Sequence, residues 1–253
     1  MKDILKQKKC GTGSMPSLSW SFVPGGGMEM IMRFKAVVFD LDGTLINSLE
    51  DLADSANAAL TKHGFGSHPV WAYKKFVGNG VRQLIKGAAP AGTPEEELES
   101  ILADYREIYN KNYANKTRPY VFIPEMLATL EKWNIKMAVC SNKPHVPTTE
   151  IVEKVLGSSC FQVVFGEREG IPRKPDPAAL LEAAGIIGVE PSEVLYLGDS
   201  GGDMEAALNA GMYAAGALWG FRDREELTAA GAQVLFEAPL KLVDFIRLHN
   251  FRE

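Results

Sequence analysis

A short apolar run, Phe34-Lys35-Ala36-Val37-Val38-Phe39, ends directly in Asp40-Leu41-Asp42-Gly43-Thr44-Leu45. A run this short and this apolar is typical of a strand that is covered on both faces of a parallel sheet. Open parallel sheets bind their ligands in the crevice at the carboxyl ends of the strands. We therefore expect Asp40 and Asp42 at a functional edge of the sheet, although aspartates also serve as turn and helix-cap residues.

Two further short apolar runs, at 135–140 and 194–198, end in polar residues in the same way. The first precedes Ser141-Asn142-Lys143, and the second ends in Gly198 and precedes Asp199-Ser200-Gly201-Gly202-Asp203. Carboxylates that gather at one sheet edge repel one another unless a cation lies between them, and Mg²⁺ prefers hard oxygen ligands. We expect Asp199 as a direct metal ligand and Asp203 as a second ligand or water-holder. Asp203 is also placed to cap a helix, and both roles are compatible.

The order of the predicted elements determines the fold class. Strand-like runs alternate with helical patterns, at about 35–40, 135–140, 162–165, 194–198 and 212–218. This alternation predicts an α/β fold, a doubly wound, Rossmann-like parallel sheet with crossover helices on both faces. The sheet core is expected at 33–46 and 119–253.

Residues 47–118 form an insertion after the first strand, with helical periodicity and no strand signal. We expect a small all-helical unit here. Within it, Gly78-Asn79-Gly80-Val81-Arg82 has two glycines around an asparagine, so that backbone amides could face an anion and Arg82 could meet a carboxylate. A helix–helix turn with a solvated Arg82 accounts for the same pattern equally well.

Four segments, in this order, resemble the motifs of the haloacid dehalogenase-like phosphohydrolase superfamily: Asp40 to Leu45, Ser141, Lys174 before Pro175, and Asp199 with Asp203. The resemblance covers about residues 33–250. It implies that Asp40 is the nucleophile, that Asp42 is the acid and base, and that Lys174 neutralises charge at the nucleophile and the phosphate. It also implies that Mg²⁺ is bound by Asp40, Asp199 and the backbone carbonyl of Asp42.

The helical insertion resembles the type 1 cap domain of this superfamily, and Ser141-Asn142-Lys143 resembles the phosphoglycolate phosphatase branch. The substrate-binding residues that these resemblances imply are Thr44, Gly78, Asn79, Gly80, Arg82, Ser141 and Asn142. The chain departs from the branch at Val121-Phe122, where phosphoglycolate phosphatases usually have Pro-Gly. We expect Phe122 to reshape the mouth of the pocket.

The composition is ordinary for a soluble globular protein. The chain has 253 residues, of which 46% are hydrophobic, and its net charge of −5 gives no electrostatic reason to expect nucleic acid or a membrane as partner. Three widely spaced cysteines favour a reducing compartment, and the location is expected to be cytoplasmic. Residues 1–32, basic at first and then rich in glycine, are expected to be a flexible extension and not a secretory signal.

The sequence thus predicts a Mg²⁺-dependent phosphomonoester phosphatase that acts through an aspartyl-phosphate, on a small phosphometabolite such as 2-phosphoglycolate. A phosphosugar mutase or an inorganic pyrophosphatase of the same superfamily is the alternative. A phosphometabolite-binding protein without catalysis is a further alternative, but such a protein has no need of an acid and base at Asp42.

Overall fold

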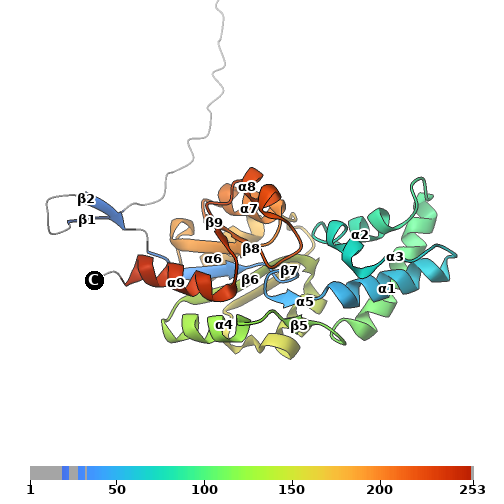
Figure 1. Cartoon of the computed structure of the whole chain (residues 1–253), viewed down its shortest axis with the longest axis horizontal. Coiled ribbons are helices and arrows are strands. Elements are labelled where there is room, and N and C mark those ends of the chain that lie inside the picture. The colour runs from blue at the N-terminus through green and yellow to red at the C-terminus, as the bar shows by residue number, and fades with distance from the viewer. Residues whose placement is uncertain (1–18, 23–27, 32, 252–253) are drawn as a thin grey trace, which may run out of the picture.

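The computed structural model of the chain describes residues 19–22, 28–31 and 33–251 (Figure 1). A parallel sheet with helices on both faces forms one part of the molecule, and a group of helices forms the other. Most of the predicted extension, 1–32, lies outside the described residues. Within it, β1 (Ser19–Phe22) and β2 (Met28–Ile31) pair antiparallel, although no strand is expected there.

The sheet has six parallel strands in the order β10-β9-β8-β3-β6-β7. Its strands are β3 (Ala36–Phe39), β6 (Lys136–Pro144), β7 (Val163–Glu167), β8 (Val194–Gly198), β9 (Tyr213–Ala217) and β10 (Val234–Phe236). The chain winds outward from β3 in one direction through β6 and β7, and then in the other through β8, β9 and β10. The reversal of strand order therefore falls between β3 and β8, where open α/β sheets bind their ligands. The predicted fold class is confirmed, and β10 is the strand that the sequence pattern missed.

Residues alternate between the two faces of the sheet, and each face has its own apolar cluster. Val37 and Phe39 of β3 face one cluster, and Ala36 and Val38 face the other. The first cluster includes side chains of α4 (Ile123–Lys132), α5 (His145–Ile151), the π-helical turn η2 (Val152–Leu156) and α9 (Pro239–Asn250). The second includes side chains of α6 (Ala178–Ile187), α7 (Gly201–Asn209) and α8 (Arg224–Ala229). Short 3₁₀ turns, η3 (Ser158–Cys160) and η4 (Pro191–Glu193), precede β7 and β8.

The helical insertion has a third, separate apolar cluster. Its helices are α1 (Leu49–Lys62), the 3₁₀ helix η1 (Val70–Lys75), α2 (Val81–Ala88) and α3 (Glu95–Asn112). Two-residue strands, β4 (Ile46–Asn47) and β5 (Arg118–Pro119), pair antiparallel where the chain leaves and re-enters the sheet part. We refer to residues 47–118 as the cap, and the boundaries of this domain stay a prediction.

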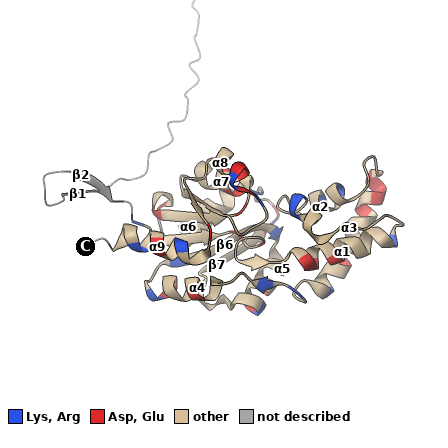
Figure 2. Cartoon of the chain, viewed as in Figure 1, with Lys and Arg blue, Asp and Glu red and all other residues tan. Residues whose placement is uncertain are grey.

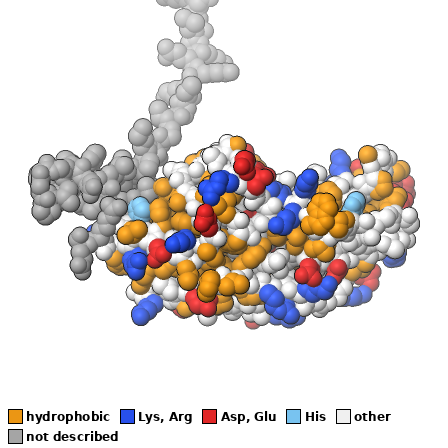
Figure 3. Space-filling view, in the orientation of Figure 1, with side chains coloured by type: hydrophobic (Ala, Val, Ile, Leu, Met, Phe, Trp, Pro, Cys, Tyr) orange, Lys and Arg blue, Asp and Glu red, His pale blue; other side chains and the backbone are white. Residues whose placement is uncertain are grey.

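Charged side chains are mixed over the face that Figure 3 shows, with lysines and arginines interspersed among aspartates and glutamates. Among the described residues, no helix combines the length and the apolar character that a membrane crossing requires. The cytoplasmic location stays a prediction.

Candidate active site

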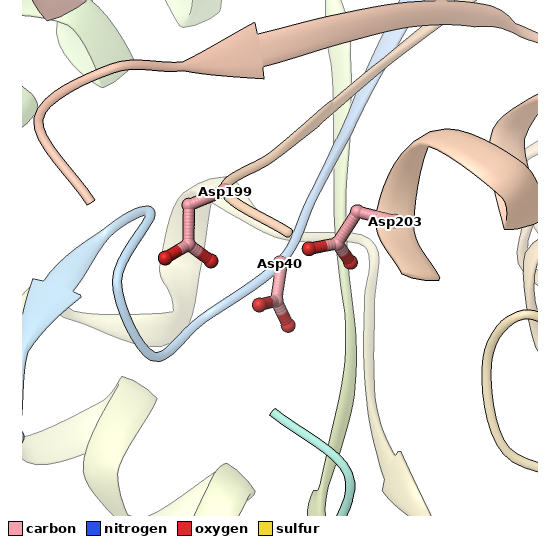
Figure 4. A group of neighbouring side chains, drawn as sticks. All are labelled: Asp40, Asp199 and Asp203. Carbon is pink, nitrogen blue, oxygen red and sulfur yellow. The ribbon is translucent and has the colours of Figure 1, made fainter. Parts of the chain in front are cut away.

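Three aspartates converge at the point where the strand order reverses. Asp40 follows β3, Asp199 follows β8, and Asp203 lies in the first turn of α7 (Figure 4). All three are buried, and one carboxylate oxygen from each lies within 4.8 Å of the others. Because neighbouring parallel strands end at the same edge, residues more than 150 positions apart in the sequence meet here.

Lys174 is a buried cation that joins two of these carboxylates. Its Nζ donates to Asp40 Oδ1 at 2.8 Å and to Asp203 Oδ1 at 2.6 Å, and also contacts the Tyr196 hydroxyl at 2.9 Å. Burial raises the pKa of Asp40 to about 6, with Asp203 adding to the shift and Lys174 opposing it. Burial would also raise the pKa of Asp203, but the ammonium of Lys174 holds it below its usual value.

Asp203 has two functions at once. Its Oδ2 accepts hydrogen bonds from the backbone N–H and the hydroxyl of Ser200, which closes a capping box at the start of α7. Its Oδ1 accepts from Lys174 and Tyr196. Since both oxygens are already engaged, Asp203 is better suited to hold Lys174 and the site than to bind a metal directly.

Asp199 has no cation in hydrogen-bond contact among the residues that the structure describes. Its Oδ2 accepts the backbone N–H of Phe221 at 2.7 Å, and it packs so closely on Gly43 and Gly220 that a Cβ at either would lie within 2.3 Å of an Asp199 atom. Burial raises its pKa well above the usual range, and the charges of Asp203 and Asp40 raise it further. Three buried carboxylates against one ammonium leave negative charge without compensation, which fits a hard divalent cation held by Asp40 and Asp199.

The carboxylate of Asp42 has a different set of partners. Lys143 Nζ lies 2.9 Å from its Oδ2 and 3.2 Å from its Oδ1, and the Ser48 hydroxyl donates to Oδ1 at 2.5 Å. The side chain of Asp42 therefore does not join the group of three aspartates, although a role of its backbone carbonyl in binding a metal stays a prediction. Lys143 belongs to the segment Ser141-Asn142-Lys143 that carries the resemblance, but the sequence analysis assigns it no role at the site.

A cavity of about 240 Å³ lies between the sheet edge and the cap. Core residues that line it include Asp40, Asp42, Ser141, Asn142, Lys143, Lys174, Asp199, Ser200, Phe221 and Arg222. Cap residues that line it include Leu52, Val77, Gly78, Gly80, Val81, Leu84, Tyr105, Arg106, Tyr109 and Asn110. The core wall is mainly polar and the cap wall mainly apolar, so the two ends of a ligand would meet different surroundings.

Three predicted substrate-binding residues do not line this cavity. Arg82 forms ion pairs with Glu95 and Glu99 at the acidic end of α3, which Figure 2 shows in red. Thr44 is fully buried, its hydroxyl has no partner in the described part of the chain, and its carbonyl accepts from the indole N–H of Trp219. Asn79 is not among the lining residues either. The acidic partners of Arg82 on α3 become adjacent to it only in the folded chain, and its role in binding a substrate stays a prediction.

Phe122 is not among the lining residues, and its effect on the pocket mouth stays a prediction. It stands at φ 68° and ψ 6°, the left-handed conformation, at the start of α4, and 46% of its surface is exposed. The usual glycine of the phosphoglycolate phosphatase branch is suited to this backbone conformation. The substitution therefore concerns the backbone at this turn and not the walls of the cavity.

The glycine turn of the cap contacts the core through its carbonyl groups. Asn142 Nδ2 donates to the carbonyl of Gly78 at 3.1 Å, and Arg222 Nη2 donates to that of Val77 at 2.7 Å. Arg222 also donates to the carbonyl of Lys74. Asn142 in addition accepts the backbone N–H of Lys174 at 2.9 Å. The turn thus docks the cap on the core, and a role in binding an anion stays a prediction.

Known proteins are similar to this chain over most of its length. The family model described as haloacid dehalogenase-like hydrolase matches residues 37–217. An N-acetylmuramic acid 6-phosphate phosphatase from Pseudomonas aeruginosa is 31% identical over 85% of this chain and 96% of the relative. A phosphoglycolate phosphatase from Haemophilus influenzae is 34% identical over 82% of this chain and 96% of the relative.

A solved structure with a similar fold agrees with this family assignment. The crystal structure of a predicted phosphoglycolate phosphatase from Haemophilus somnus superposes with a TM-score of 0.77 and 27% identity. The match covers 84% of this chain and 97% of that one. The chain belongs to the haloacid dehalogenase-like hydrolase family and is one of its phosphatases.

Proposed function

We propose that the protein is a Mg²⁺-dependent phosphomonoester phosphatase that acts through an aspartyl-phosphate on a small phosphometabolite such as 2-phosphoglycolate. The observation that carries this proposal is the separation of two carboxylates that line one cavity. Asp40 pairs with Lys174 at 2.8 Å, whereas Asp42 pairs with Lys143 at 2.9 Å. Two carboxylates with different partners at one site are suited to two different chemical tasks.

Asp40 is the proposed nucleophile, because it lies at the end of β3 next to a buried cation and to Asp199. When bound by Asp40 and Asp199, Mg²⁺ would offset the repulsion between the carboxylate and the phosphate. Lys174 holds Asp40 in place and supplies a positive charge toward the transferring phosphoryl group. Ser141, which also lines the cavity, is placed to donate a hydrogen bond to a phosphoryl oxygen.

Asp42 is the proposed acid and base. As the Asp40 oxygen bonds to phosphorus and the bond to the leaving oxygen breaks, Asp42 gives its proton to that oxygen. The carboxylate of Asp42 then takes a proton from water, whose oxygen bonds to phosphorus and releases Asp40. Asp42 is thus regenerated as the acid, and inorganic phosphate leaves.

The cap wall supplies the recognition of the leaving group. Arg106 lines the cavity from α3 and makes no ion pair among the described residues, whereas Arg222 pairs with Glu226. We propose Arg106, in place of Arg82, as the cation that meets an anionic group on the substrate. The names of the relatives, which concern phosphoglycolate and N-acetylmuramic acid 6-phosphate, support a small phosphorylated substrate.

The test measures inorganic phosphate released from 2-phosphoglycolate, hexose 6-phosphates, nucleotides and pyrophosphate, with Mg²⁺ and with a chelator. We expect Mg²⁺-dependent release from at least one small phosphomonoester. Asp40→Asn should lower it on the order of 1,000-fold or more, because the nucleophile is removed. Asp244→Asn, which changes a surface carboxylate paired with Arg247, is the matched control and should keep full activity.

Mass spectrometry tests the intermediate. With p-nitrophenyl phosphate, whose leaving group needs no proton, Asp42→Asn should accumulate one phosphoryl group on the peptide that contains Asp40. Phosphate release without any such adduct, or release unaffected by Asp40→Asn, would contradict the mechanism. Conversion of a sugar phosphate into its isomer without phosphate release would identify a mutase, and cleavage of pyrophosphate alone would identify a pyrophosphatase.

A further inference from the structure

Lys143 is a buried cation that the mechanism above leaves without a task. It lies near the end of β6, and only 4% of its side chain is exposed. Its Nζ contacts both oxygens of Asp42, at 2.9 and 3.2 Å, and lies 4.8 Å from the centre of the Tyr109 ring. Burying an ammonium is costly unless it is paired, so this arrangement holds Lys143 in one position.

The carboxylate of Asp42 accepts hydrogen bonds from two sides. The Ser48 hydroxyl, from the segment between β4 and α1, donates to Oδ1, and Lys143 contacts the same oxygen and Oδ2. A carboxylate on a loop has two free torsions, and contacts from two directions fix both. Charge-assisted hydrogen bonds of this kind are about twice as strong as neutral ones.

Tyr109 brings the cap into this arrangement. It lies on α3, its ring stacks on that of Tyr105 with centroids 5.4 Å apart, and the ring lies against Lys143 of the core. An ammonium near a buried aromatic ring is attracted to it, more strongly when water is excluded. Lys143 therefore contacts the acid and base on one side and the cap on the other.

We propose that Lys143 is a positioning residue for Asp42, and that Tyr109 makes this positioning depend on the seating of the cap. This inference rests on the proposed function. Lys143 holds the Asp42 carboxyl toward the leaving oxygen and stabilises the carboxylate that forms when the proton is transferred. Lys143 bonds to Asp42 and makes no hydrogen bond to the nucleophile Asp40, and in this it differs from Lys174.

Two classes of phosphate ester separate this role from a general loss of structure. Alkyl phosphates have poor leaving groups that require a proton, whereas p-nitrophenyl phosphate does not. Lys143→Met should lower the single-turnover rate of phosphoryl transfer to Asp40 by about 10- to 100-fold for alkyl phosphates and by less than about 3-fold for p-nitrophenyl phosphate, since only the alkyl leaving group needs the proton of Asp42. Hydrolysis of the phosphoryl-enzyme is common to both esters and is therefore measured separately. Lys143→Gln, which keeps a polar group at the site, is the second variant and should show the same selectivity in weaker form.

Three controls keep the test decisive. Lys154→Met removes an exposed lysine that lies over the ring of Tyr113, outside the cavity, and should change neither ester. Asp42→Asn should show the same selectivity for alkyl esters in phosphoryl transfer to Asp40, and should slow hydrolysis of the phosphoryl-enzyme from either ester. In the Asp42→Asn background, Lys143→Met should add less than a further factor of about 2, because residues that act as one unit are not additive.

The outcomes for Lys143 and for the phosphatase are distinguishable. No Mg²⁺-dependent release from any ester by the unaltered protein would overturn the proposed function itself. An active protein in which Lys143→Met and Lys143→Gln slow phosphoryl transfer from both ester classes equally would overturn the role of Lys143 alone. For the cap, Tyr109→Leu should impair alkyl esters selectively while Tyr109→Phe, which keeps the ring, should not; equal effects of the two variants would overturn the dependence on the cap.

Discussion

Gly43 illustrates how single residues determine the geometry of this site. Its φ of +88° belongs to the left-handed region, and a Cβ built on it would lie 2.2 Å from Asp199 Oδ2. The residue therefore turns the chain after Asp42 and leaves room for a carboxylate from another strand. Gly64 has a similar φ of +76°, but apart from its chain neighbours no atom of the described residues lies within 4 Å of a Cβ built there. The two glycines share the backbone conformation and differ in what surrounds them.

Replacing each glycine by alanine separates strain from displacement of the site. Gly64→Ala should lower the free energy of unfolding by about 1 kcal/mol, from the left-handed strain, and keep activity. Gly43→Ala should in addition push Asp199 aside and lower kcat/KM by about 100-fold or more, because displacements of about 1 Å have effects of that size. Chemical denaturation measures the free energy of unfolding of each variant, and phosphate release measures its kcat/KM. Equal activity losses in the two variants would show that the contact with Asp199 is unimportant.

Some of the site residues could be predicted from the sequence and others could not. Asp40, Asp199 and Lys174 could be predicted, because each follows a strand-like run or belongs to a motif whose place in the order of motifs is fixed. The pairing of Lys143 with Asp42 joins residues 101 positions apart, and the docking of Arg222 on Val77 joins residues 145 apart. Such pairs depend on how the cap is seated on the core, and no local pattern encodes that.

The cap and the core meet through a small number of hydrogen bonds between elements. Arg222, in the segment after β9, reaches the carbonyls of Lys74 and Val77 at the end of η1, and Asn142 of β6 reaches that of Gly78. Arg222 is held in turn by Glu226 on α8, with Nε 3.3 Å from the carboxylate. The helix α8 thus fixes the position of Arg222, which bonds the cap to the core.

Removing this contact should loosen the cap without unfolding it. Arg222→Met should raise KM for a small phosphomonoester by about 5- to 30-fold, since it removes charge-assisted hydrogen bonds between the cap and the core. Hydrogen exchange of the 70–80 segment should become faster. Arg224→Met, which removes a surface pair with Glu237, is the control and should leave both unchanged. Unchanged exchange at 70–80 in Arg222→Met would show that the cap is held by other contacts.

Among the strands, those that coincide with a longer apolar run could be predicted from the sequence. Strands β3, β6, β7, β8 and β9 follow the predicted runs, although β6 continues to Pro144 because its last residues still pair with β7. The edge strand β10 has only three residues, and β4 and β5 have two each. Runs this short carry no detectable periodicity, so their pairing becomes visible only in the structure.

The balance of charge at the site affects the stability of the whole molecule. The pKa of Asp40 is 3.8 in an ordinary environment and about 6 in the folded protein, because burial disfavours its charge. Between about pH 4 and 6 the folded state therefore binds more protons at Asp40 than the unfolded state. In the absence of metal, the contribution of this group to stability falls as pH rises through that range, and the raised pKa of Asp199 acts in the same direction.

Mg²⁺ should therefore stabilise the fold more at pH 7.5 than at pH 5.0, where it competes with protons on Asp40 and Asp199. Saturating Mg²⁺ should raise Tm by about 5 °C or more at pH 7.5 and by less than half of that at pH 5.0. The Tm measured in MgCl₂ is compared with the Tm measured in NaCl at equal ionic strength. The same rise at both pH values would indicate that the cation binds somewhere other than these carboxylates.

The docking of the cap has a consequence for how the pocket can change. The cap atoms that accept hydrogen bonds from Arg222 and Asn142 are main-chain carbonyls of Lys74, Val77 and Gly78. A main-chain acceptor is present whatever side chain the residue carries. The apolar wall formed by Val81, Leu84 and their neighbours can therefore be redesigned for other leaving groups while these docking contacts remain in place, so the cap is the natural place to engineer a new substrate range.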